Sequence, residues 1–112
     1  ACAAKAGCKD TADAADCFSD PAVDAVIIAS VTNSHFGYIK AALQAGKAVY
    51  TEKPISHDPV ELLEIIELAE ATGLTFMVGY QRRIDENFLE LQAQCAAGAV
   101  GPLRVIKCCS RD

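Results

Sequence analysis

Three short polar segments contain most of the side chains that could do chemistry away from helix surfaces. The first is the tripeptide Glu52-Lys53-Pro54, in which the proline fixes one backbone angle and restricts the preceding lysine to an extended shape. A lysine held rigidly in this way could hydrogen-bond a substrate hydroxyl and assist proton transfer. A surface ion pair before a turn explains the same residues, so the tripeptide alone leaves both interpretations open.

The second polar segment, residues 30–35, has the sequence Ser-Val-Thr-Asn-Ser-His. Its small hydroxyl and amide side chains stand at an expected strand-to-helix turn, where they and the free N–H groups of the helix could face the ribose or phosphate of a nucleotide. Simple capping of that helix explains the segment equally well. His35 is also open to two interpretations. A histidine near a helix start can be a packed or solvated side chain, or it can contact a ligand.

The third polar segment, residues 79–83, has the sequence Gly-Tyr-Gln-Arg-Arg. The guanidinium of Arg82 could make a forked contact with a polar substrate, or it could be solvated or pair with a helix. We expect Arg83 and Asp85 to have structural roles. The fingerprint Gly-x-Gly-x-x-Gly is absent, and the close glycine pair near residue 100 follows an expected helix instead of opening one, so it is not a phosphate-binding loop.

Apolar periodicity indicates the elements that must position these segments. Short apolar runs predict strands, and apolar stripes spaced by three or four residues and ended by glycine predict helices. The expected strands cover residues 25–29, 48–50, 74–80 and 103–108. One expected helix ends at residue 6, and the others cover residues 11–18, 35–45, 59–72 and 85–97. This alternation predicts the α/β class, with a parallel sheet, flanking helices and right-handed crossovers.

The expected strand at residues 25–29 is apolar on both faces. Its run Val26-Ile27-Ile28, without alternation, is typical of a central strand of a parallel sheet that helices cover on both sides. The expected helix N-caps are Thr11, the run 32–34 and Asp58, which Pro59 follows in the first turn. Ligands bind such sheets at the carboxyl ends of the strands. Because all three polar segments follow strands, we expect them to converge at one edge.

Composition limits the class of protein. With 112 residues, of which 52% are hydrophobic, the chain is one globular domain or part of one. The net charge of −5 and the dispersed basic residues argue against a nucleic-acid partner, and the longest apolar run is too short to span a membrane. The six cysteines show no metal-ligand spacing and residues 1–6 form no signal core, so we expect reduced thiols, no metal site and a cytoplasmic location. The missing initial Met and the truncated first helix lead us to expect further sequence upstream.

Several motifs occur in a fixed order along nearly the whole chain. They are Asp24-Ala-Val-Ile-Ile-Ala-Ser30, Thr32-Asn-Ser-His35, Ala45-Gly-Lys-Ala-Val49, Glu52-Lys-Pro54, Val78-Gly-Tyr-Gln-Arg-Arg83, Gly98-Ala-Val-Gly-Pro102 and Ser110-Arg-Asp112. Each is weak alone, but their ordered spacing resembles the Gfo/Idh/MocA oxidoreductases. Within that family, the Thr-Asn-Ser-His turn, the Arg-Arg-Ile-Asp continuation and the final Ser-Arg-Asp look most like inositol 2-dehydrogenases.

This resemblance implies a Rossmann-type domain that binds NAD, with NADP possible, followed by an α/β domain that carries substrate and homo-oligomer contacts. Residues 1–101 would be a partial NAD(P)-binding domain, and residues 102–112 would begin the C-terminal domain. The implied reaction oxidises a secondary hydroxyl of a polyol or sugar to a ketone, with hydride transfer to nicotinamide.

The resemblance also implies roles for individual residues. Lys53 would be the catalytic lysine that contacts the substrate hydroxyl and the cofactor, and Arg82 would reach toward the substrate. The residues implied to bind the cofactor are Ser30, Thr32, Asn33, His35, Glu52, Lys53, Pro54 and Gln81. Val31 stands where many relatives have proline, which is a minor departure.

Other departures from the family pattern have more weight. The glycine-rich first turn, the acidic residue that selects between NAD and NADP, and the later catalytic Asp and His have no counterpart in these 112 residues. We therefore expect an internal fragment of an enzyme that is inactive alone and presents an unpaired apolar sheet edge. The alternative is a truncated, non-catalytic binding or assembly module derived from this family.

Overall fold

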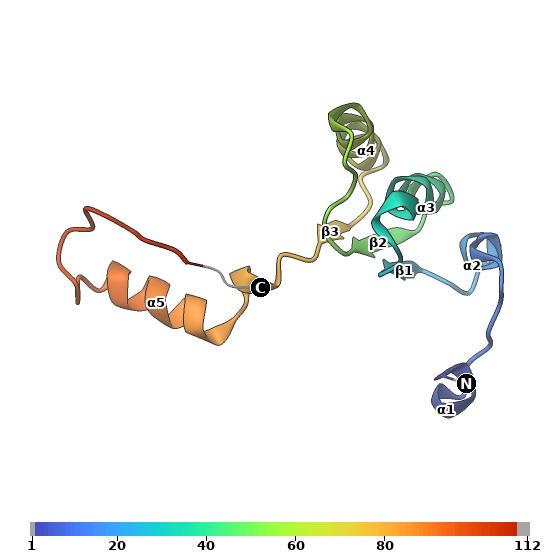
Figure 1. Cartoon of the computed structure of the whole chain (residues 1–112). Helices are drawn as coiled ribbons and strands as arrows, with labels where there is room; N and C mark the ends of the chain where they lie inside the picture. Colours follow the sequence, from blue (N-terminus) through green and yellow to red (C-terminus); the bar gives the residue numbers. More distant parts are fainter. Residues whose placement is uncertain (1, 110–112) are drawn as a thin grey trace. The chain divides into compact units, whose positions relative to one another are not determined.

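A computed structural model describes residues 2–109 of the chain (Figure 1). The chain divides into two compact units, Ala1–Gly79 and Tyr80–Asp112. The Ser-Arg-Asp motif at residues 110–112 lies outside the described residues. The expected domain boundary at residues 101 and 102 stays a prediction, since the division into compact units falls earlier in the chain.

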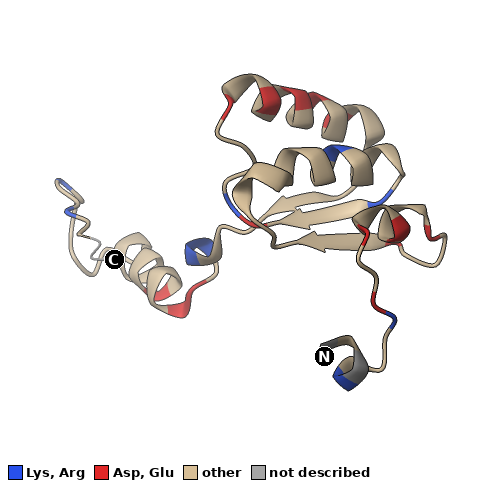
Figure 2. Ribbon diagram, turned by 45° about the vertical axis from the view of Figure 1, so that its right-hand side comes forward, with Lys and Arg blue, Asp and Glu red and all other residues tan. Residues whose placement is uncertain are grey.

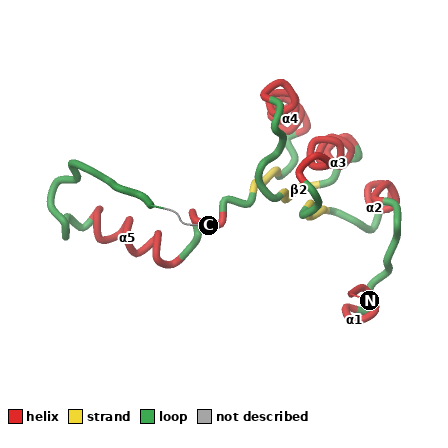
Figure 3. The backbone as a smooth tube through the Cα atoms, viewed as in Figure 1, coloured by secondary structure: helices red, strands yellow, loops and turns green. Residues whose placement is uncertain are grey.

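The first unit is an α/β structure, which confirms the predicted class. Its three strands form one parallel sheet in the order β1-β2-β3, and helices connect them (Figure 3). Its elements are α1 (Cys2–Ala6), α2 (Ala14–Ser19), β1 (Ala25–Ile28), α3 (Thr32–Gln44), β2 (Ala48–Thr51), α4 (Pro59–Thr72) and β3 (Phe76–Val78). All three strands of this sheet were expected, β3 as a longer element.

The core lies between one face of the sheet and the helices α3 and α4. Figure 2 shows both helices on the same side of the strands, with acidic residues spaced along α4. The expected stripe on α3 is buried, and it packs with residues from the strands, from the segment after β2 and from α4. The buried apolar residues are Ile28, Ile39, Ala42, Leu43, Val49, Ile55 and Ile65. Removing this surface from water is the main favourable contribution to folding.

Two features of β1 differ from the prediction of a central strand covered on both sides. β2 takes the central position, and β1 lies at an edge of the three-stranded sheet. Ile27 is 78% exposed and Met77 is 52% exposed, because no helix in residues 2–79 packs on that face. An apolar run shows that both faces of a strand can be buried, but a face is buried only where another element packs on it.

The helix starts also correct two of the expected caps. Asp13, not Thr11, caps α2, because its carboxylate accepts from the Ala15 N–H at 2.9 Å. The helix α3 begins at Thr32 with Val31 as N-cap and without a capping side chain, so residues 32–34 lie inside its first turn. Asp58 caps α4 as expected, accepting from the Val60 N–H at 2.8 Å.

The second unit contains a 3₁₀ turn, η1 (Gln81–Arg83), and one helix, α5 (Glu86–Ala96). Asp85 caps α5 by accepting from the Asn87 and Phe88 N–H groups at 3.0 and 3.3 Å. The strand expected at residues 103–108 is absent from the described part of this unit. A strand needs a neighbour for its ladder of hydrogen bonds, and the described residues of this unit provide none.

Candidate functional site

Hydrogen bonds hold the carboxyl ends of the three strands side by side. The Glu52 N–H donates to the Ile28 carbonyl at 2.9 Å, which ties the end of β2 to β1. The Gly79 N–H donates to the Thr51 carbonyl at 2.8 Å, which ties the end of β3 to β2. The polar segments 30–35 and 52–54 therefore lie at one edge of the sheet, as the alternation of elements predicts.

His35 connects these two segments directly. Its side chain is 1% exposed, and it lies in the first helical turns of α3. Its Nδ1 atom lies 2.7 Å from the Pro54 carbonyl oxygen, and its Nε2 atom lies 3.0 Å from the Ser30 carbonyl oxygen. His35 is thus packed between two main-chain carbonyls, and the cofactor contact that the resemblance implies for it stays a prediction.

Lys53 is exposed, while the backbone on both sides of it is anchored. Glu52 donates its N–H to β1 and accepts from the Thr51 hydroxyl at 3.2 Å through its carbonyl oxygen. The Lys53–Pro54 peptide bond is cis, and Ile55, the next residue, is buried in the core. The tripeptide thus presents a solvent-accessible ammonium group on a fixed main chain.

The start of α3 supplies hydroxyl, amide and backbone N–H groups next to this lysine segment. Ser30 and Asn33 are exposed, and the Ser30 and Ser34 hydroxyl oxygens lie 2.7 Å apart. The Ser34 hydroxyl also lies 2.8 Å from the Val31 carbonyl, to which it donates. The N-cap residue Val31 contributes no side-chain hydrogen bond to the first turn, although its carbonyl accepts from the Ser34 N–H at 2.9 Å.

Tyr50 belongs to this edge, although none of the three polar segments contains it. A Cβ atom built on Gly79 would lie 2.6 Å from the Tyr50 hydroxyl oxygen and 3.1 Å from Glu52 Oε1. Both side chains therefore approach the main chain where β3 ends, which only a glycine permits. The signal was present in the sequence, because Tyr50 and Glu52 are two residues apart and so project to the same face of an extended chain.

Gln81 and Arg82 lie in the second unit, on the 3₁₀ turn η1. The guanidinium carbon of Arg82 lies 5.8 Å from the centroid of the Phe88 ring, which is within cation–π range. Arg83 lies similarly over Tyr80, at 5.7 Å. The roles expected for Gln81 in cofactor binding and for Arg82 in substrate binding stay predictions.

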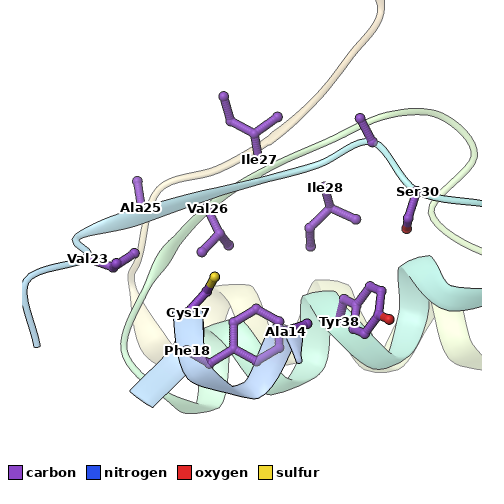
Figure 4. Close-up of a pocket in the computed structure, with 11 residues that line it drawn as sticks. Ala14, Cys17, Phe18, Val23, Ala25, Val26, Ile27, Ile28, Ser30 and Tyr38 are labelled. Carbon is purple, nitrogen blue, oxygen red and sulfur yellow. The ribbon is translucent and has the colours of Figure 1, made fainter. Parts of the chain in front are cut away.

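A further hollow, which no sequence motif indicated, lies beside β1. It is lined mainly by apolar residues of α2, β1 and α3, with Ser30 at one end. Figure 4 shows that Val26 and Ile28 project toward Phe18 and Tyr38, whereas Ala25 and Ile27 point away from them. The hollow can accept apolar surface, and it lies next to the polar groups that follow β1.

Within the described residues, no group of three His, Cys, Asp or Glu side chains could hold a metal ion. The cysteines whose state is defined, Cys8, Cys17, Cys95, Cys108 and Cys109, are free thiols. Among helices of residues 2–109, none has the length and apolar character needed to cross a membrane.

Comparison with known proteins gives consistent matches. Residues 1–80 match the model of the oxidoreductase family with an NAD-binding Rossmann fold, Gfo/Idh/MocA. Inositol 2-dehydrogenase of Acidothermus cellulolyticus is 42% identical over 83 residues, which cover 73% of this chain and 24% of that protein.

Solved structures agree with the sequence matches. An NAD-binding protein from Listeria innocua superposes with a TM-score of 0.81 at 36% identity, over 89% of this chain and 30% of that one. The apo scyllo-inositol dehydrogenase of Lactobacillus casei gives a TM-score of 0.81 at 29% identity, over 88% and 30%. The chain thus spans less than a third of these relatives. On the family match and the shared fold, it belongs to the Gfo/Idh/MocA oxidoreductases with an NAD-binding Rossmann fold.

Proposed function

We propose that the chain is part of an NAD(P)-dependent dehydrogenase that oxidises a secondary hydroxyl of a polyol or sugar, such as an inositol, to a ketone. The observation that carries this proposal is the exposed Lys53 on a main chain anchored on both sides, at the carboxyl ends of β1 and β2. Ligands bind open α/β sheets at this edge. The names of two relatives, an inositol 2-dehydrogenase and a scyllo-inositol dehydrogenase, support the substrate class.

The residues at this edge have the chemistry that a dinucleotide requires. Hydroxyl and amide groups at Ser30 and Asn33 suit the hydroxyls of a ribose, as does the carboxylate of Glu52. The first turn of α3 offers backbone N–H groups and the positive end of a helix dipole to a negatively charged group. We assign these groups, with Thr32 and Pro54 beside them, to cofactor binding.

The reaction removes a hydride from carbon and a proton from oxygen. When bound, the nicotinamide ring accepts the hydride. Lys53 would donate a hydrogen bond to the substrate oxygen, whose proton leaves to solvent water. The O–H electron pair then forms the second bond of the C=O group as the C–H electron pair leaves with the hydride. The ammonium is suited to this task because three N–H donors on a long stem reach a hydroxyl without a fixed fork geometry.

The same proposal extends to partners and location. The small-molecule substrate is the polyol or sugar, and the dehydrogenase acts as a homo-oligomer in the cytoplasm. Free thiols at the described cysteines are compatible with a reducing compartment. Arg82 would bind the substrate and Gln81 the cofactor.

The test uses the complete product of the gene that contains this chain. Lys53→Ala is expected to lower kcat with NAD and myo-inositol by about 10²–10⁴-fold, the range for a proton-transfer group, while the dissociation constant for NAD changes little. Lys40→Ala is the matched control, because Lys40 is a partly exposed lysine on α3 whose ion-pair partner is Glu64.

Activity is followed by NADH formation, and NAD binding by calorimetry. Turnover that survives Lys53→Ala would contradict the role of this lysine. A wild-type protein that binds NAD but oxidises no polyol or sugar would contradict the reaction. Cooperative folding with no NAD binding would favour the non-catalytic module.

A further inference from the structure

We propose that His35 is a positioning residue that fixes the main chain around Lys53. This inference rests on the proposed function, since it assigns His35 an effect on the reaction that Lys53 performs. His35 itself is 1% exposed, so it is placed to act through the lysine segment and not by touching the substrate.

The contacts of the imidazole ring carry the inference. The ring reaches the carbonyl oxygen of Pro54, the residue after the lysine, and the carbonyl oxygen of Ser30, the second residue after β1. These two residues come from different loops at the same edge. The ring therefore lies between the two loops and contacts the main chain of each, from a helix that packs on the sheet core.

The contact with His35 involves the carbonyl oxygen of Pro54. A proline has no backbone N–H, so its carbonyl oxygen is its one main-chain hydrogen-bonding group. His35 Nδ1 lies 2.7 Å from that oxygen. A neutral imidazole has a single N–H and so donates to only one of the two carbonyls. The shorter separation, 2.7 Å, assigns this N–H to Nδ1, toward Pro54.

Hydrogen bonds of Glu52 and His35 hold the main chain on both sides of Lys53. Glu52 is bonded to β1 through its N–H and to Thr51 through its carbonyl, on the N-terminal side of the lysine. His35 holds the C-terminal side through Pro54. The Lys53 main chain is thus fixed at both flanks while the side chain stays exposed. Precise placement matters because a shift of about 1 Å in a reacting group can cost on the order of 100-fold in rate.

The kinetic test compares His35→Phe with His35→Gln in the complete protein. Phenylalanine keeps a planar ring but has no N–H donor, whereas glutamine keeps two N–H donors. We expect His35→Phe to lower kcat by roughly 10- to 100-fold with a KM for polyol changed less than about threefold, and His35→Gln to recover part of the loss. Leu43→Ala is the control, because Leu43 is equally buried in α3 but has no hydrogen-bonding side chain. Each variant is assayed well below its unfolding temperature.

A double mutant separates positioning from general destabilisation. If His35 acts through the lysine, His35→Phe lowers kcat little further when Lys53→Ala is already present. An unchanged kcat in His35→Phe, or losses that simply multiply, would overturn the proposal.

Hydrogen–deuterium exchange of the peptide spanning residues 50–56 gives a readout that does not depend on turnover. We expect His35→Phe to speed exchange of the Glu52 amide about tenfold. In Leu43→Ala, the Glu52 amide should still exchange more slowly than the amides of the rest of the core. If the wild-type protein lacks dehydrogenase activity, the proposed function fails, and the exchange data alone decide whether His35 holds the loop. Exchange that is unaffected by His35→Phe would refute the bracing contact even in an active enzyme.

Discussion

The two compact units use their apolar residues in opposite ways. In Ala1–Gly79, side chains from β1, α3, β2 and α4 are buried together, and Ile39 and Ile65 are fully inaccessible. Among the described residues of the second unit none is buried, and Leu91 on α5 is 57% exposed. Yet both units contain helices with aspartate N-caps and apolar stripes. Local signals are therefore sufficient to form a helix, whereas burial depends on a second layer.

The same contrast applies to the candidate site residues. Lys53 stands on a main chain held by hydrogen bonds to β1 and to His35. Gln81 and Arg82 stand on a single 3₁₀ turn without buried residues. Positioning by a packed scaffold is thus a property of the first unit.

The largest expected effect is on the core of the first unit. Ile39→Ala is expected to lower the free energy of unfolding by about 2–5 kcal/mol, because it removes buried methyl groups and leaves a cavity. Leu91→Ala, on α5, is the matched control and is expected to change it by less than about 0.5 kcal/mol, as for an exposed position. Urea unfolding followed by circular dichroism measures both. Equal losses would show that the apolar face of α5 is buried in solution and would remove the contrast between the units.

A smaller effect is expected at Gly79, the last residue of the first unit. Gly79→Ala would place a Cβ atom 2.6 Å from the Tyr50 hydroxyl oxygen, so that the tyrosine has to move. We expect a loss of about 1–3 kcal/mol, typical of overpacking. Adding Tyr50→Phe removes that oxygen and should restore part of the stability.

Gly37→Ala provides the control for the glycine substitution. Nothing lies within 4 Å of a Cβ atom at Gly37, which is in α3, so alanine there should stabilise the unit by about 0.5–1 kcal/mol. Thermal unfolding compares the stability of Gly79→Ala, Gly79→Ala with Tyr50→Phe, and Gly37→Ala with that of the unsubstituted protein. A neutral Gly79→Ala would mean that the Tyr50 and Glu52 side chains do not crowd the end of β3.

Much of this structure was predictable because its signals are local or periodic. The parallel sheet of β1, β2 and β3 followed from strand–helix alternation, although their order did not, and the buried stripe of α3 followed from spacings of three and four. The placement of Glu52-Lys53-Pro54 beside residues 30–35 followed from the rule that strand ends share an edge.

The parts that sequence alone did not predict depend on contacts between distant residues. The exposed face at Ile27 depends on which helices are present, and the missing strand at residues 103–108 depends on a pairing partner. The role of His35 was open because a histidine's partners here are carbonyl oxygens 5 and 19 residues away. Thr11 and Asp13 are both good caps, and only geometry distinguishes them.

The smallest expected effect compares the two capping aspartates. Asp58→Ala and Asp85→Ala each remove a carboxylate that accepts from first-turn N–H groups, which costs about 0.5–2 kcal/mol of helix stability. The two substitutions should destabilise different parts of the chain. Because α4 is tied to the core through Ile65, loss of the Asp58 cap should lower the unfolding free energy of the whole first unit. Because α5 has no buried residue, loss of the Asp85 cap should only fray the first turns of α5.

Amide exchange at Leu62 and Leu89 distinguishes the two variants: Asp58→Ala should speed exchange across the sheet, while Asp85→Ala should act only within α5. Sheet exchange that responds to Asp85→Ala would mean that the units unfold together, and that local capping in the second unit contributes to the scaffold beneath Lys53.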